Sequence, residues 1–124
     1  MNIDAQKLVL NGKEYVPVDS VNLPLAQACD GLKYVIIRTY SAGVFAGYLE
    51  SRSGKEVVLR QVRRLWCWYG AASLSQLAVD GTSLPKKCKF PCEVAEITLT
   101  EAIEVIACTE KAMKSIKDVP IWTA

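Results

Sequence analysis

Short runs of β-branched and aromatic residues alternate with polar turns through the middle of the chain. Residues 33–40 (KYVIIRTY), 44–50 (VFAGYLE) and 55–62 (KEVVLRQV) have this character, and small or polar residues at 41–43 and 51–54 separate them. Such runs are typical of β-strands. Because connections this short join strands that run in opposite directions, the pattern predicts an antiparallel meander.

The first 32 residues follow a different pattern. Residues 7–18 (KLVLNGKEYVPV) place Asn11 and Gly12 between two short apolar runs, and this dipeptide favours a tight hairpin turn. We therefore expect a hairpin at residues 7–18. The whole chain has the length of a single domain.

Two segments have the spacing and the end signals of short helices. Residues 71–79 (AASLSQLAV) repeat apolar side chains at helical spacing, and Gly81 follows where a glycine commonly ends a helix. Thr109 is a suitable N-terminal cap for the lysine-rich segment that follows it. Its lysines gather towards the C-terminal end, where the helix dipole favours positive charge. The sequence thus predicts helices near 71–79 and 109–117.

Residues 94–107 (VAEITLTEAIEVIA) fit either a helix or strands. As a helix, the segment would be capped by Thr100. As a strand, it would place four apolar residues on one face: Ile97, Leu99, Ile103 and Val105. The density of Ile, Val and Thr favours strands. The predicted fold class is therefore α+β, with an antiparallel β-sheet of five or more strands and two short helices.

Composition limits the classes of protein to which the chain can belong. The chain is 51% apolar and 23% charged, which is enough to form a core and slightly apolar for a small soluble domain. Because small domains expose much of their surface, we expect part of this apolar surface to be buried in a homo-oligomer, in the simplest case a dimer. The net charge of +2 argues against a general nucleic-acid coat protein.

The chain shows no targeting or membrane signal. Its N-terminus lacks an apolar run of signal-peptide length, and no stretch reaches the roughly 18 apolar residues of a membrane span. The five cysteines are an odd number, which favours reduced thiols. These features predict a cytoplasmic protein that does not contact a membrane.

The sequence gives little support for a metal site or for enzyme activity. Cys88 and Cys92 could join Cys67 and Cys108 around zinc, but the usual C-x2-C pairs are absent and buried thiols explain them better. The chain has no histidine, so the commonest general base is missing, and it has no glycine-rich phosphate loop. We expect a non-enzymatic protein without a metal or cofactor.

The segment RRLWCWYGAASLSQLA at 63–78 begins with two arginines, two tryptophans and a tyrosine within seven residues. If the preceding strand continues through the start of this segment, alternation places one set of side chains on a single face: Val58, Arg60, Val62, Arg64, Trp66 and Trp68. Arg63 and Tyr69 fall on the other face, and Arg38 lies on a similar aromatic face of the first strand. Arginine binds phosphate and tryptophan stacks on bases. In the alternative interpretation, the rings belong to a core or interface and the arginine stems cover them.

Gly70 and Ser73 lie where the first helix is expected to begin. A helix start offers unpaired backbone N–H groups to an anion, and small residues allow a ligand to approach. In the alternative interpretation, the same residues are ordinary N-terminal caps of the helix itself.

Two longer segments carry a family resemblance. KYVIIRTYSAGVFAGYLESRSGKEVVLRQVRRLWCWYGAASLSQLA and EITLTEAIEVIACTEKAMKSI resemble a family of small proteins of unknown function that tailed bacteriophages and prophages encode. The match covers roughly residues 33–117, which implies a family-like core over 33–117 and a hairpin-containing N-terminal extension over residues 1–32. The resemblance implies a phage gene that acts in the cytoplasm of an infected bacterial host, and it supplies no catalytic residues.

Together these features support one leading hypothesis of function. The protein would bind a small nucleotide as a sponge against host defence, sequestering a cyclic or ADP-ribose-type immune signal. The candidate ligand-binding residues are Arg38, Arg60, Arg63, Arg64, Trp66, Trp68, Tyr69, Gly70 and Ser73. Two alternatives stay open: a protein-interaction module that inhibits or recruits a host protein, and a single-stranded nucleic-acid binder, which the low net charge disfavours.

Overall fold

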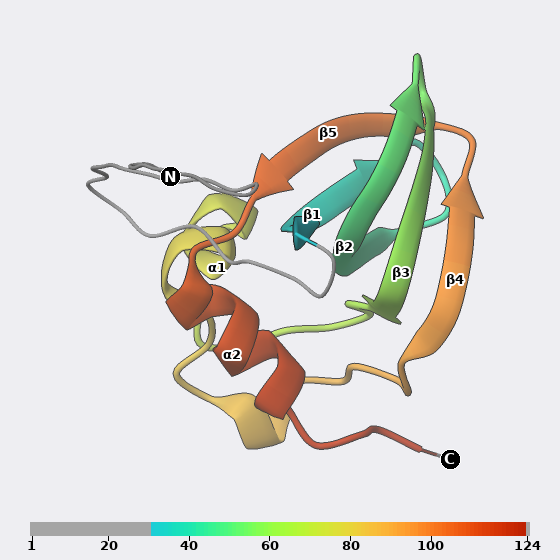
Figure 1. The fold of residues 1–124 in the computed structure, drawn as a ribbon. Helices are drawn as coiled ribbons and strands as arrows, with labels where there is room; N and C mark the ends of the chain where they lie inside the picture. The colour runs from blue at the N-terminus through green and yellow to red at the C-terminus, as the bar shows by residue number, and fades with distance from the viewer. Residues whose placement is uncertain (1–30, 124) are drawn as a thin grey trace, which may run out of the picture.

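A computed structural model describes residues 31–123, which form five strands, two α-helices and a 3-10 turn (Figure 1). The strands are β1 (Lys33–Thr39), β2 (Val44–Ser53), β3 (Glu56–Arg64), β4 (Val94–Leu99) and β5 (Ala102–Ala107). The helices are α1 (Leu74–Asp80) and α2 (Glu110–Asp118), and the 3-10 turn is η3 (Pro85–Lys87). The predicted α+β class is confirmed. The expected hairpin at 7–18 lies outside the described residues.

All five strands belong to one antiparallel sheet with the order β4-β3-β2-β1-β5. The predicted meander holds from β1 to β4, whereas β5 returns to pair with β1. Only Thr100 and Glu101 connect β4 to β5, yet these strands occupy opposite edges of the sheet. The sheet must therefore curl until its edges meet at this corner, as Figure 1 shows where β5 arches away from the end of β4.

The concave face of the sheet encloses one apolar core. Alternate residues of the strands point into it, as expected for pleated backbone. Its buried members are Val35, Ile37, Phe45, Val57, Leu59, Val62, Leu99 and Ala102. This inner core holds the curled sheet together without a contribution from either helix.

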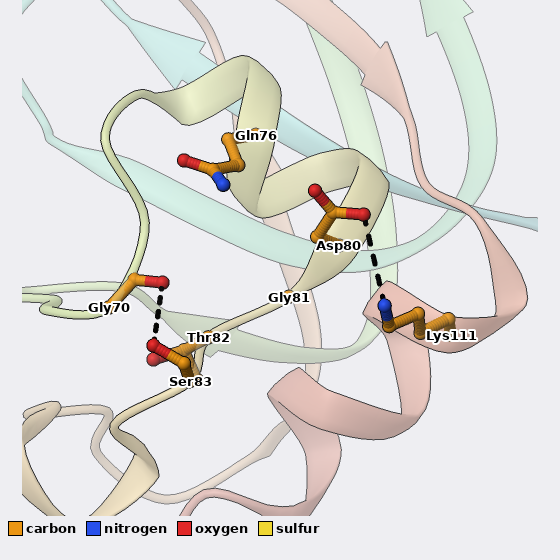
Figure 2. Close-up of a pocket in the computed structure, with 7 residues that line it drawn as sticks. All are labelled: Gly70, Gln76, Asp80, Gly81, Thr82, Ser83 and Lys111. Carbon is orange, nitrogen blue, oxygen red and sulfur yellow. Dashed lines mark hydrogen bonds and ion pairs between the residues drawn. The ribbon is translucent and has the colours of Figure 1, made fainter.

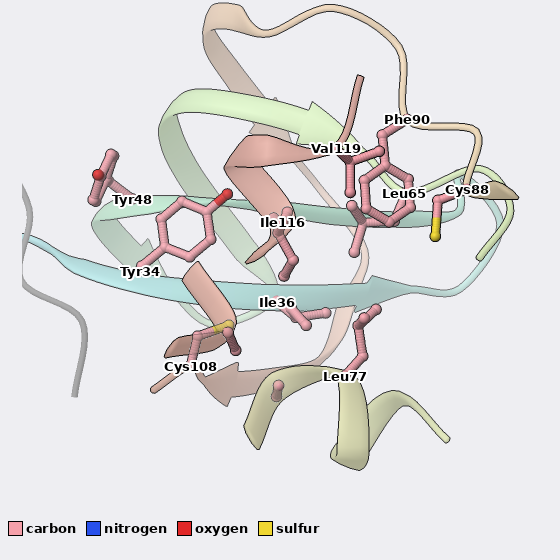
Figure 3. Close-up of a cluster of buried hydrophobic side chains, with 13 residues drawn as sticks. Tyr34, Ile36, Tyr48, Leu65, Leu77, Cys88, Phe90, Cys108, Ile116 and Val119 are labelled. Carbon is pink, nitrogen blue, oxygen red and sulfur yellow. The ribbon is translucent and has the colours of Figure 1, made fainter. Parts of the chain in front are cut away.

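A second core lies between the convex face of β1 and β2 and the two helices (Figure 3). Tyr34 and Ile36 of β1 pack there against Leu77 of α1, Ile116 of α2 and Phe90 of the intervening loop. Since β1 is buried on both faces, it has a nearly continuous apolar run instead of alternation. This outer core fixes the loops between β3 and β4 against the sheet.

The turn between β2 and β3 lies later than predicted. A turn was expected at 51–54, but β2 continues to Ser53, which pairs with Glu56. Gly54 has φ of 61°, so it adopts the left-handed conformation that a two-residue hairpin turn requires. The polar side chains before Gly54 are exposed, so the β2–β3 hairpin can extend beyond the rest of the sheet without burying them.

The helices agree with the prediction except at the start of α1. That helix begins at Leu74 because the Ser73 hydroxyl caps it, and it ends at Gly81 as expected. Thr109 caps α2 as predicted, accepting a hydrogen bond from the Ala112 N–H at 3.1 Å. Neither helix in the described range is long and apolar enough to span a bilayer.

Residues 94–107 form two strands, which confirms the preferred interpretation. A bulge in β5 interrupts the alternation, however: Arg38 pairs with Glu104 and Thr39 with Ala102, so Ile103 is an extra residue without a partner on β1. Leu99 is buried in the inner core and Val105 packs against it, but Ile103 is 46% exposed. The predicted common face was therefore wrong for Ile103, because it assumed unbroken alternation.

Candidate functional site

A bulge in β3 changes which candidate residues share a face of the sheet. Gln61 has φ of 49°, and the pairing with β2 skips a position between Arg60 and Arg63, opposite Gly47. Side chains before and after the bulge therefore alternate out of phase. Arg60 and Arg64 point to opposite faces, so the prediction that they share one was wrong.

Arg63 is buried and closes the C-terminal end of α2. Its Nη1 donates to the carbonyl oxygens of Ile116 at 2.8 Å and Val119 at 2.9 Å. Its Nη2 and Nε donate to the carbonyls of Phe90 at 2.7 Å and Pro91 at 3.0 Å. Burial lowers the pKa of Arg63, and these four oxygens replace the water it has lost. The guanidinium is therefore engaged by the protein's own backbone.

Arg38 and Arg60 both lie on strands and both face acidic residues. Arg38 donates from Nε to Glu104 at 2.7 Å, across the pair β1–β5. Arg60 lies 3.9 Å from Glu50, and both side chains are partly exposed. These ion pairs hold the side chains of Arg38 and Arg60 at two different places on the sheet, the first across β1 and β5 and the second across β3 and β2.

Arg64 lies at the end of β3 and packs over a ring. Its guanidinium carbon is 4.5 Å from the centre of the Phe45 ring, and its Nη1 donates to the Ala42 carbonyl at 2.5 Å. Arg64 thus covers the end of the inner core with its stem, as the alternative interpretation of the sequence expected. The structure does not gather the four candidate arginines into one cluster.

Trp68 and Tyr69 follow the end of β3 in irregular backbone. Trp68 is half-buried and packs against the outer core, whereas Tyr69 is 52% exposed. The Tyr69 carbonyl accepts a hydrogen bond from the Thr82 hydroxyl. The predicted strand therefore does not continue through these aromatic residues, and only Tyr69 of the two presents its ring to solvent.

Gly70 and Ser73 are both engaged in local hydrogen bonds. The Gly70 carbonyl accepts from the Ser83 N–H at 3.2 Å, and the Ser73 hydroxyl accepts from the Gln76 N–H at 3.1 Å. The Ala72 N–H donates to the Gln76 side chain at 2.7 Å. At the start of α1, the N–H groups of Ala72 and Gln76 are therefore already bonded to side chains, in an arrangement similar to a capping box.

Two tryptophans form an exposed stack that sequence reasoning anticipated only in part. The rings of Trp66 and Trp122 are nearly parallel at 6°, with centroids 5.2 Å apart. The Lys89 ammonium lies 5.4 Å from one centroid and 5.7 Å from the other. Trp66 is 58% exposed, Trp122 42%, and the neighbouring Ile121 60%. We call these four residues the tryptophan surface.

Backbone pairing brings three distant segments together at this surface. Cys67 and Lys89 exchange two backbone hydrogen bonds, at 2.7 and 3.4 Å. Phe90 forms a parallel bridge with Ile121 and accepts a hydrogen bond from the Trp122 N–H at 3.1 Å. Lys89 and Trp122 were missed because only this tertiary pairing places them beside Trp66. The signal available in the sequence was the pair of large apolar residues, Ile121 and Trp122, that closely follows α2.

Two further lysines lie close to Lys89 in the sequence. Lys86 and Lys87 of η3 precede Lys89 in the same loop. In residues 31–123, no acidic side chain forms an ion pair with any of these three lysines. Exposed indole faces accept planar rings, and lysine donors bind phosphate oxygens. The surface can therefore hold a ligand that combines a planar base with negative charge.

The described cysteines are dispersed. Cys88 and Cys108 are buried, Cys67 is half-buried and Cys92 is exposed. Burial raises the pKa of the Cys108 thiol to about 12. No group of three or more potential metal ligands occurs among residues 31–123. Cys29 lies outside the described residues, so the prediction that all five thiols are reduced stays a prediction.

Comparison with known proteins identifies a family. The family model described as Domain of unknown function (DUF6948) matches residues 32–116. No curated protein and no solved structure matches the chain. The matched range includes Trp66 and Lys89 but ends before Trp122, so the tryptophan surface joins residues of the family domain to the segment that follows it.

Proposed function

This chain belongs to the family described as Domain of unknown function (DUF6948), and we propose that it binds a small nucleotide without catalysing a reaction. One observation carries the proposal: Trp66 and Trp122 stack in an exposed position with the Lys89 ammonium close to both rings. Large aromatic side chains are normally buried when they serve only stability. An exposed pair beside a cation suits a ligand with both a base and a phosphate.

The binding mode follows from the chemistry of the two groups. A nucleobase would extend the stack by lying on an exposed indole face, because every base offers a π-face to an aromatic ring. The phosphate would be bound by Lys89, with Lys86 and Lys87 adding positive charge nearby. In this proposal lysines replace the arginines as phosphate ligands, because the described arginines already contact protein groups.

We further propose that the ligand is a cyclic or ADP-ribose-type signal of a host defence system. The support is the resemblance of residues 33–117 to small proteins of tailed bacteriophages. In that setting the protein would act in an infected bacterial cell and lower the free concentration of the signal. Tight binding without turnover is sufficient for such a sponge.

A protein-interaction module is the second candidate. The observation that favours it is Ile121, which is 60% exposed next to the tryptophan stack. Tryptophan is enriched among the residues that dominate protein–protein interfaces, and an exposed apolar neighbour extends such a surface. This candidate uses the same side chains and predicts a different partner.

A thermal-shift screen of the full chain against mono-, di- and cyclic nucleotides and ADP-ribose tests the proposal. We expect a ligand that raises the melting temperature of the wild type. Lys89→Ala should weaken its binding by about 10- to 150-fold, because a charge-assisted hydrogen bond is lost. Trp66→Ala should weaken it through loss of the stacking face.

Tyr40→Ala and Lys114→Ala are matched controls. Tyr40 is a 79% exposed aromatic residue, and Lys114 is an exposed cation of α2 paired with Glu110. Both variants should bind as the wild type does. If no nucleotide stabilises the protein, while a host protein co-purifies with the wild type and is lost with Trp66→Ala, the nucleotide proposal is wrong and the interaction module replaces it.

A further inference from the structure

A hollow of about 430 Å³ opens between α1, the loop after it and the first turn of α2 (Figure 2). Its polar side chains are those of Gln76, Asp80, Thr82, Ser83 and Lys111. This volume lies within the range of roughly 300–1,000 Å³ that small-molecule sites occupy. The hollow shares no lining residue with the tryptophan surface, so a ligand bound in it would be independent of the proposed nucleotide site.

The hollow contains one negative and one positive side chain. Asp80 Oδ1 and Lys111 Nζ lie 3.9 Å apart, and Figure 2 shows them reaching towards each other from α1 and α2. Their side chains are 51% and 74% exposed, respectively. A long, exposed ion pair contributes little to stability, and separating it for a ligand costs correspondingly little.

Both charges stand where two helix ends meet. Asp80 is the last residue of α1, and Lys111 is the second residue of α2. The Thr109 N–H and hydroxyl donate to the carbonyls of Ala78 and Val79, at 3.0 and 2.6 Å, so the N-terminus of α2 abuts the C-terminus of α1. Each charge is therefore at the unfavourable end of its own helix and beside the favourable end of the other, and the junction places both at the hollow.

The wall opposite these charges is fixed by hydrogen bonds. The Ser83 N–H and hydroxyl both donate to the Gly70 carbonyl, at 3.2 and 3.3 Å. The Thr82 N–H donates to the Ser115 hydroxyl at 2.9 Å, which ties the loop to α2. The site is therefore preorganised, and a ligand would not have to order this loop.

Gln76 provides a further donor. Its side-chain oxygen accepts from the Ala72 N–H, so the orientation of the amide is set. Among residues 31–123, its Nε2 group donates no hydrogen bond to a protein atom. Gln76 therefore presents N–H groups to the hollow beside one carboxylate and one ammonium.

From this arrangement we propose that the hollow binds a small zwitterion of the α-amino acid class. The ligand's ammonium contacts Asp80, its carboxylate contacts Lys111, and Gln76 and Ser83 contact a polar side chain. The lining carries no net charge, which matches a ligand that carries none. A phosphate-rich ligand would instead bring several negative charges beside the Asp80 carboxylate, with Lys111 as the one cation in the lining.

Isothermal titration calorimetry of the full chain with the twenty common amino acids tests this site, with glucose, acetate and methylammonium as separate probes. We expect at least one polar amino acid to bind and the three probes not to bind. Asp80→Asn and Lys111→Gln should each weaken binding by about tenfold or more. Both variants should melt close to the wild-type temperature, because the ion pair that they remove is long and exposed.

Lys114→Gln is the matched control, because Lys114 lies on the same helix and pairs with Glu110 at 3.8 Å without lining the hollow. It should bind as the wild type does. The proposal fails if no amino acid binds, if glucose binds as well as the best amino acid, or if binding survives both Asp80→Asn and Lys111→Gln.

Discussion

Single residues decide the role of the charged segment that precedes α1. Arg63 was a candidate phosphate ligand, yet its donors meet four carbonyl oxygens from two segments. Two of those carbonyls belong to the C-terminal end of α2, where helices leave acceptors unpaired. Its neighbour Arg64 lies over Phe45 at the surface. Adjacent arginines therefore serve different purposes that their sequence context does not distinguish.

Arg63→Ala should lower the free energy of unfolding by about 3 kcal/mol or more, because several buried carbonyls lose their donor. Arg63→Lys should restore only part of this, since one ammonium cannot replace a planar fork with donors on three nitrogens. Chemical denaturation measures both. Arg64→Ala, which removes an exposed contact, should cost less than about 1 kcal/mol. An Arg63→Ala protein as stable as the wild type would contradict this assignment.

Burial of Cys108 makes stability depend on alkaline pH. The pKa of its thiol is raised from 9.0 to about 12, so the folded state keeps the proton after the unfolded state has released it. This contribution to stability is complete below about pH 9 and is lost as the pH rises towards 12. Denaturation at a series of pH values should show a shallower alkaline decline for Cys108→Ala. An identical decline in both proteins would refute this.

At the scale of elements, alternation and end signals predicted most of the structure. The apolar runs of β1 and β2, the Ser73 and Thr109 caps and the Gly81 end signal identified strands and helices. The bulge at Gln61 could not be predicted, because glutamine is not a residue that favours positive φ. Its basis is tertiary: Gly47 on the paired strand leaves room for the extra residue.

Gly47→Ala tests that explanation. A Cβ at this position would lie 2.9 Å from Val62 Cβ and 3.2 Å from the Arg60 carbonyl oxygen. Backbone and a branched side chain cannot yield easily, so we expect a loss of about 1–3 kcal/mol in unfolding free energy. Ser51→Ala, an exposed position on the same strand, is the control. Equal denaturation midpoints for the two variants would show that the close approach is not required.

The whole molecule combines a core inside the curled sheet with a second core beneath the helices. The fold class could be predicted because each element carries its own signal. The tryptophan surface could be predicted only as far as Trp66, since Lys89 and Trp122 reach it through pairing of distant segments. The candidate arginines do not share one face of the sheet, because alternation gave no information about the bulge at Gln61 or about the carbonyls near Arg63.

Self-association is expected at this scale. The chain is 51% apolar, and in its described part Tyr40, Trp66 and Ile121 are each more than half exposed. Burying such side chains between subunits removes apolar surface from water. Light scattering at micromolar concentration should give a mass of a dimer or a multiple of one. A mass of 13.7 kDa, that of one chain, would contradict the expectation.

The most direct test of the nucleotide proposal is a tryptophan-fluorescence titration. The full chain is titrated with the nucleotide that the thermal screen selects, with its nucleoside and with ribose phosphate. Because the proposed surface binds base and phosphate together, the nucleotide should quench saturably and bind at least about tenfold more tightly than either fragment. Equal binding of the nucleoside, or no saturable quenching by the nucleotide, would contradict the assignment of Trp66, Trp122 and Lys89.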